Sequence, residues 1–129
     1  MILLECVTAY MAVQALMEQP FPYKAAHALM MLKRKMQPHV EFFSQEEMKL
    51  VEEFAEKDVV NKKILWTDKG AFRFDAGKDP SEYARRRVDL GAVEVEWGIE
   101  RIKVPCPASI TPAQLEALEK FIEFEEADG

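Results

Sequence analysis

The stretch that decides the fold of this chain is KAAHALMMLKRKMQPHVEFFSQEEMKLVEEFAEKD, residues 24–58. Apolar residues recur in it three or four positions apart, which keeps them on one face of an α-helix. These residues are Ala25, Leu29, Leu32, Met36, Val40, Phe43, Leu50 and Phe54. The pattern predicts one long amphipathic helix. Such a helix extends about 50 Å at about 1.5 Å per residue, so it needs packing partners along its whole length.

Pro38 stands near the middle of this predicted helix. Proline lacks a backbone N–H donor and its ring clashes with the preceding turn, so we expect a kink there. The apolar stripe keeps its phase across Pro38, which favours a single kinked helix. Two alternatives are a new helix with Pro38 at its first position and a break at Ser44, where residues 44–47 form a capping box.

The N-terminal segment predicts a shorter helix over residues 2–18. Its apolar stripe repeats every three or four residues and comprises Leu3, Cys6, Tyr10, Val13 and Met17. Pro20 and Pro22 follow it, and proline cannot continue a helix. The short connection makes the two helices an antiparallel hairpin over residues 1–58. The longer helix then overhangs, and either the C-terminal half of the chain or a second protomer is expected to cover it.

Residues 59–105 predict a small antiparallel β element with one short helix. Two apolar runs, 63–66 and 71–74, flank a turn that ends at Gly70, which is typical of a hairpin. A helix over residues 80–90 is indicated by Asp79 as a capping residue, Pro80 at its first position and Gly91 at its end.

Residues 93–99 alternate between apolar and polar side chains, which predicts a half-buried strand. Ile102 and Val104 fall on the opposite parity, so we expect a β-bulge near Gly98. A turn at Gly98 that separates two strands is the alternative.

The C-terminal segment, residues 110–126, predicts a helix that runs to about Glu125. Thr111 and Gln114 form a capping box with Pro112 at the first helical position. Its apolar face comprises Leu115, Leu118, Phe121 and Ile122. The sequence therefore predicts a single domain over residues 1–129, mostly helical and of the α+β class.

The composition restricts the classes of function. With 17 basic and 23 acidic residues the net charge is −6, which argues against direct binding of nucleic acid. Cys6 and Cys106 match no metal-ligand spacing, and we favour two free, buried thiols in a reducing compartment over one disulfide. His27 and His39 lie about 18 Å apart along a helix axis, too far to share a metal ion. No nucleophile elbow or phosphate-binding loop is present, so we predict no enzyme, no cofactor and no metal.

Two charged clusters are the candidate binding residues. Acidic residues of the long helix form either an ordinary solvated face or a surface that mimics nucleic acid; the residues expected to contact a partner are Glu46, Glu47, Glu53 and Glu56. The basic cluster comprises Arg85, Arg86 and Arg87. Three consecutive helical residues cannot all face one ligand, so we favour ion pairs, with binding of an anion or nucleotide as the alternative.

Phe42 and Phe43 are adjacent, and one narrow helical stripe cannot bury both of them. This indicates either a core with several sides or a protein-protein surface. Both phenylalanines are therefore candidate partner-binding residues. We favour an oligomer over a monomer.

The chain resembles a family of small, uncharacterised proteins encoded by phages, prophages and mobile elements of Gram-positive (Firmicutes) gut bacteria. The matching stretches are KAAHAL (24–29), residues 32–41 with their proline, LVEEFAEKD (50–58), GAVEVEW (91–97) and ITPAQLEALEKFI (110–122). The resemblance implies a helical hairpin with a small β element and a C-terminal helix. It implies a phage context, in which structural, assembly and anti-defence roles are all open.

The leading hypothesis is a non-enzymatic accessory protein of a phage or mobile element. It would act in the bacterial cytoplasm by binding a host or phage protein, as a homo-oligomer. The N-terminus lacks the basic start of a signal peptide. It also lacks the uninterrupted run of about 20 apolar residues that a membrane span needs, so we expect no membrane association. One alternative is an inhibitor of a host nuclease defence, like an anti-CRISPR protein. The other is a sponge for an anionic signalling nucleotide.

Overall fold

The computed structural model describes residues 1–98 and 100–126. Its elements in chain order are α1 (Leu3–Leu16), α2 (Tyr23–Phe54), α3 (Pro80–Gly91), β1 (Ile102–Pro105), α4 (Pro112–Leu118) and β2 (Ile122–Glu125). The described part of the chain is thus mostly helical with one small sheet, which confirms the predicted α+β class. No helix in this part is both long and apolar enough to cross a lipid bilayer.

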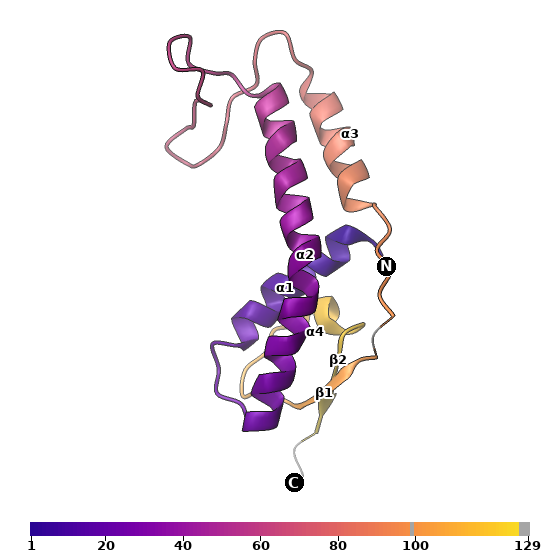
Figure 1. Ribbon diagram of the computed structural model, residues 1–129. Coiled ribbons are helices and arrows are strands. Elements are labelled where there is room, and N and C mark those ends of the chain that lie inside the picture. Colours follow the sequence, from indigo (N-terminus) through magenta and orange to yellow (C-terminus); the bar gives the residue numbers. More distant parts are fainter. Residues whose placement is uncertain (99, 127–129) are drawn as a thin grey trace.

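The helical hairpin is confirmed. The first helix, α1, runs down the molecule, and α2 rises antiparallel to it after a short connection (Figure 1). Pro38 lies inside α2, which continues unbroken from Tyr23 to Phe54. The alternatives of a new helix at Pro38 and a break at Ser44 are therefore wrong. The helix ends before the predicted Asp58 because Ala55 already has extended backbone angles.

The main core lies along the first half of α2. Its buried residues from the hairpin are Cys6, Ala9, Ala12, Val13 and Leu16 of α1 with Ala25, Leu29, Leu32 and Met36 of α2. The C-terminal segment closes this core with Val104, Leu118, Phe121 and Ile122. Cys6 is buried and free, and burial raises the pKa of its thiol to about 11. Cys106 is also free, which confirms two free thiols, but it is exposed, so its predicted burial is wrong.

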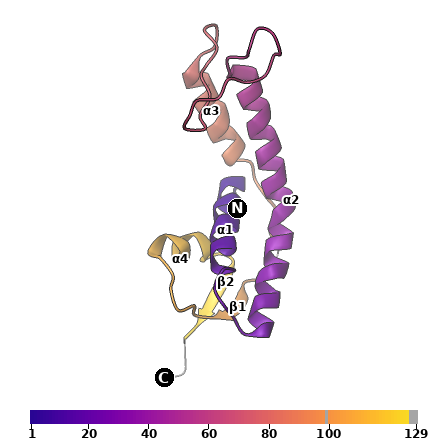
Figure 2. The ribbon, with the colours of Figure 1, turned by 90° about the vertical axis from the view of Figure 1, so that its left-hand side faces the viewer.

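The second half of α2 is covered by α3, which lies beside it (Figure 1 and Figure 2). This helix begins as predicted: the Asp79 side chain accepts a hydrogen bond from the Ser81 N–H at 2.9 Å, and Pro80 is its first residue. A small apolar cluster of Leu3, Phe43 and Val95 joins the two halves of the molecule. The cover for the overhanging helix thus comes from the C-terminal half of the chain.

The sheet is parallel, so the predicted antiparallel arrangement is wrong. Strand β1 pairs with β2 in the register Ile102 to Ile122 and Val104 to Phe124. The chain between them contains α4, and parallel neighbours need such a crossover connection. The predicted C-terminal helix is correspondingly too long, because α4 ends at Leu118. Phe121 and Ile122 are adjacent and both buried, and burial in the core overrides their helical spacing.

The other predicted strands are reduced to isolated bridges. Residues 93–98 form no strand, although Glu94 makes an antiparallel bridge with Ile2. The predicted hairpin survives as one antiparallel bridge between Trp66 and Phe72 around a turn that contains Gly70, at a φ of 75°. The β-bulge predicted near Gly98 involves residue 99, which lies outside the described residues.

Gly91 permits the close approach of α3 to α1. It is buried at the end of α3, and a Cβ at this position would lie 3.2 Å from the Leu4 Cβ. Because that Cβ is fixed to the backbone of α1, a side chain at position 91 pushes the two helices apart.

We therefore expect Gly91→Val to lower the free energy of unfolding by about 1–3 kcal/mol, the usual cost of overpacking. Urea denaturation followed by circular dichroism measures it. Gly77→Val is the matched control, since nothing lies within 4 Å of a Cβ at Gly77. Equal denaturation midpoints for the two variants would show that α3 does not contact α1 in this way.

Candidate functional site

The acidic and basic clusters singled out in the sequence meet on neighbouring helices. Arg86 of α3 pairs with Glu53 of α2 at 2.7 Å, and Arg87 pairs with Glu47 at 3.0 Å. Arg85 lies 3.8 Å from Glu82 on its own helix. All three arginines are thus engaged in ion pairs within the chain. An anionic ligand would have to replace these carboxylates.

The four glutamates predicted to contact a partner do not form one free acidic surface. Glu47 and Glu53 are paired with α3, and Glu46 pairs with Lys49 one turn along α2 at 2.9 Å. Glu56 lies beyond the end of α2, where its backbone N–H donates to the Arg73 carbonyl. A nucleic-acid mimic would have to present the first three carboxylates free of their cationic partners.

The Arg86–Glu53 pair has a defined electrostatic signature. The hydrogen bond from Arg86 lowers the pKa of the Glu53 carboxyl below its ordinary value of 4.5. The same guanidinium lies over the Phe54 ring, 5.5 Å from its centroid. Gly91 is the only residue of α3 that is buried, so these ion pairs and partly buried contacts, such as Tyr83 against Phe54, attach most of α3 to α2.

The two phenylalanines have different environments, as their adjacency predicted. Phe43 is buried against Leu3 and Val95, whereas 45% of the Phe42 surface is exposed. Phe43 also forms part of a concave surface between α1 and α3.

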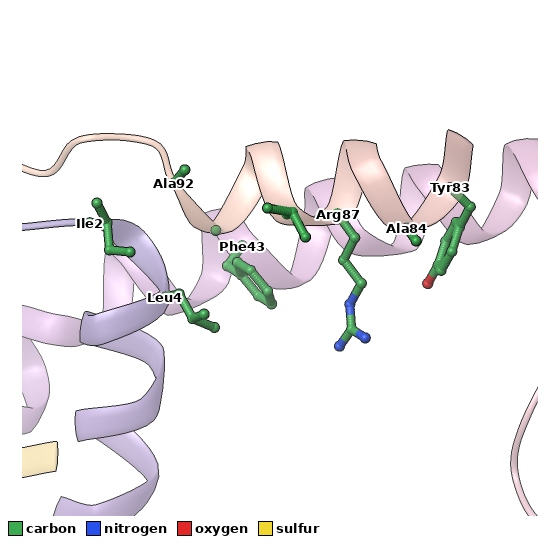
Figure 3. Close-up of a pocket in the computed structure, with 9 residues that line it drawn as sticks. Ile2, Leu4, Phe43, Tyr83, Ala84, Arg87 and Ala92 are labelled. Atoms are coloured by element: carbon green, nitrogen blue, oxygen red, sulfur yellow. The ribbon is translucent and has the colours of Figure 1, made fainter. Parts of the chain in front are cut away.

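This concave surface, the α1–α3 groove, has a volume of about 530 Å³. It is lined by Ile2, Leu4, Phe43, Tyr83, Ala84, Arg87, Val88, Gly91 and Ala92. The side chains of Leu4, Phe43 and Arg87 point toward the same open side of the groove (Figure 3). Tyr83 and Arg87 supply its polar side-chain atoms, and the remaining lining is apolar or glycine.

Sequence reasoning missed most of the groove because its residues come from three separate segments. Leu4 is 49% exposed and Val88 70% exposed, on α1 and α3 respectively. One signal was available in α1, which is apolar on nearly all sides, although a helix at a protein surface usually has a polar face. The pairing of α1 with α3 is not encoded in either helix alone.

The chemistry available at the groove is that of a binding surface. A pocket with mainly apolar walls and few polar groups suits an apolar side chain or a ligand with one anionic or hydrogen-bonding group. Within residues 1–98 and 100–126, no cluster of three or more His, Cys, Asp or Glu residues is arranged to hold a metal ion. Among the described residues that line the groove, none pairs a nucleophile with a base.

The chain matches no protein-family model, no curated protein and no solved structure.

The Arg86–Glu53 pair predicts a specific change on titration. A carboxyl with a lowered pKa in the folded state stabilises the fold above its unfolded pKa, and this contribution is lost as the pH falls through the folded pKa. Arg86→Gln should raise the pKa of Glu53 toward 4.5 and weaken the dependence of stability on pH below that value. Carboxyl ¹³C NMR measures the titration directly. Arg85→Gln, which removes an equal charge from the same helix, should leave the pKa of Glu53 at its wild-type value. The same Glu53 titration curve in both variants would contradict the pairing of Arg86 with Glu53.

Proposed function

We propose that this protein acts by binding another protein, without catalysis, and that the α1–α3 groove is the contact surface. The observation that carries the proposal is the apolar lining of the groove together with the exposed Leu4 and Val88 at its edges. Contiguous exposed apolar surface on a protein is typical of an interaction site. Such a surface gains free energy when a partner excludes water from it.

A protein partner is favoured over a small ligand by the continuation of this surface beyond the groove. Met11 of α1 is 66% exposed. It lies seven positions after Leu4, or about two helical turns, which places both residues on the same side of that helix. Apolar surface that extends along a helix suits a partner helix or strand. Arg87 adds a cation at the rim, and rim charges help to set the orientation of a partner.

This proposal corresponds to the role of an accessory protein of a phage or mobile element that works in the bacterial cytoplasm. It is favoured over nucleic-acid mimicry and over capture of an anionic nucleotide because the charges that either role requires are paired with one another. Glu53 with Arg86 and Glu47 with Arg87 are the two pairs concerned.

The proposal is tested by placing a photo-crosslinking residue at Val88 and irradiating lysate of the organism that encodes the chain. We expect one discrete crosslinked protein. The matched control places the same group at Tyr23, which is 91% exposed at the start of α2, and should give no discrete product. Adding Ala84→Glu, which puts a charge in the groove, should reduce the Val88 product at least about tenfold, as loss of a central contact does.

Ser81→Glu adds the same charge to α3 outside the groove and should leave the Val88 product unchanged. If Val88 and Tyr23 give the same products, or if Ala84→Glu leaves the Val88 product intact, the groove is not the contact surface.

A further inference from the structure

The connection between α2 and α3 carries two adjacent exposed valines in an ordered turn. Val59 and Val60 are 94% and 93% exposed, the largest exposures among the large hydrophobic residues in the described part of the chain. Residues 58–63, here called the valine turn, lie at the far end of α2, on a loop that projects from the helices (Figure 1). Two valines left in water forgo the favourable free energy of burying their apolar surface.

The backbone of the valine turn is held by its own hydrogen bonds. The Asp58 carboxylate accepts from the Val60 N–H at 2.8 Å and from the Asn61 N–H at 3.1 Å. The Asp58 carbonyl accepts from the Lys62 N–H at 2.9 Å, with Lys62 at a φ of 59°. Lys57 and Ile64 close the base of the turn with an antiparallel bridge. The valines are therefore presented by a preorganised turn, which lowers the entropic cost of docking them.

Three lysines flank the two valines in the sequence. Lys57, Lys62 and Lys63 form no ion pair with any residue that the structure describes. The valine turn thus presents two apolar side chains flanked by cationic residues. Such a surface is complementary to an apolar hollow with an acidic rim.

A hollow of that description lies on the same chain, between α1 and α4. It has a volume of about 470 Å³ and includes Leu4, Thr8, Ala113, Ala117 and Phe121. We call it the α1–α4 groove. Figure 2 shows α4 and α2 on opposite sides of α1, and the lining residues of the groove come from α1 and from residues 113–121.

The rim of the α1–α4 groove is acidic. Glu116 and Glu119 are exposed on and directly after α4 and line the hollow. Neither forms an ion pair within residues 1–98 and 100–126. Glu5 also lies on the rim, but its carboxylate is bonded to Lys120. Two free carboxylates therefore remain to meet a cationic partner.

We propose that the valine turn of one copy of this chain docks in the α1–α4 groove of a second copy. Val59 and Val60 would fill the hollow, and Lys62 and Lys63 would lie against Glu116 and Glu119. Within one copy the two surfaces do not meet. The valine turn lies beyond the C-terminal end of α2, whereas α4 packs on α1 at the level of the first half of α2 (Figure 1). The contact joins two different surfaces, so it is heterologous and produces head-to-tail rings or open chains.

This inference goes beyond the proposed function, because it concerns association between copies of the chain. The α1–α4 groove shares Leu4 with the α1–α3 groove but includes neither Val88 nor Ala84, the residues that test the proposed function. Failure of the Val88 crosslinking experiment leaves it intact, and its own failure leaves the α1–α3 groove intact. The two proposals are therefore tested separately.

The test uses two variants that each disable one side of the contact. Val59→Ser with Val60→Ser removes the apolar apex without changing the net charge. Glu116→Lys with Glu119→Lys reverses the rim. Analytical ultracentrifugation should show that the wild-type chain associates with rising concentration, whereas each variant alone remains monomeric, with a dissociation constant raised at least about tenfold.

Mixing the two variants gives the most specific outcome. Each retains the half of the contact that the other lacks, so an equimolar mixture should form a 1:1 heterodimer and nothing larger. Tyr23→Ser and the pair Glu18→Lys with Glu52→Lys are controls at exposed positions outside both surfaces, and they should associate like the wild type. Circular dichroism of each variant shows that it is folded.

Three results would overturn the proposal. One is a wild-type chain that stays monomeric. This includes the case in which Val59 and Val60 bind anionic lipid vesicles or another protein and the chain does not associate with itself. Another is an oligomer that both double variants retain. The third is a mixture of the two folded variants that yields no heterodimer.

Discussion

The length of α2 is the constraint on which the structure depends. This helix has 32 residues, whereas α1 has 14. At about 1.5 Å per residue, α2 is more than twice as long as α1. The main core therefore covers only the first half of the long helix, and the exposed remainder requires a second partner.

The chain supplies α3 as that second partner. This helix is attached largely by the pairs Arg86–Glu53 and Arg87–Glu47 and by contacts around Phe54. A core of apolar contacts and a second region held by ion pairs and aromatic contacts thus share one helix. The α1–α3 groove forms at the junction between these two regions, where Gly91 allows α3 to close against Leu4. The valine turn projects from the far end, where α2 has passed beyond the main core. Both surfaces follow from folding shorter elements against one long helix.

The sequence predicted the elements whose signals are local. Pro20 and Pro22 after α1, the stripe of α2, and Asp79 with Pro80 at the start of α3 each act within a few residues. The parallel sheet was missed because Phe121 and Ile122 fit a helical stripe equally well, and only burial against the hairpin makes them part of a strand-forming segment. Ion pairs were favoured for the three arginines, but their partners could not be assigned because the paired residues lie 33 and 40 residues apart in the sequence. The sequence identifies the charged residues but does not show which residue of α3 pairs with which residue of α2.

The most direct test of this account is hydrogen exchange along α2 in a variant with Arg86→Gln and Arg87→Gln. We predict faster amide exchange over residues 43–54, because α3 loses part of its attachment there. Residues 25–36, which pack in the main core, should keep their wild-type exchange rates. Equal acceleration of both halves, or no change in either, would contradict the claim that α3 independently covers the second half of α2.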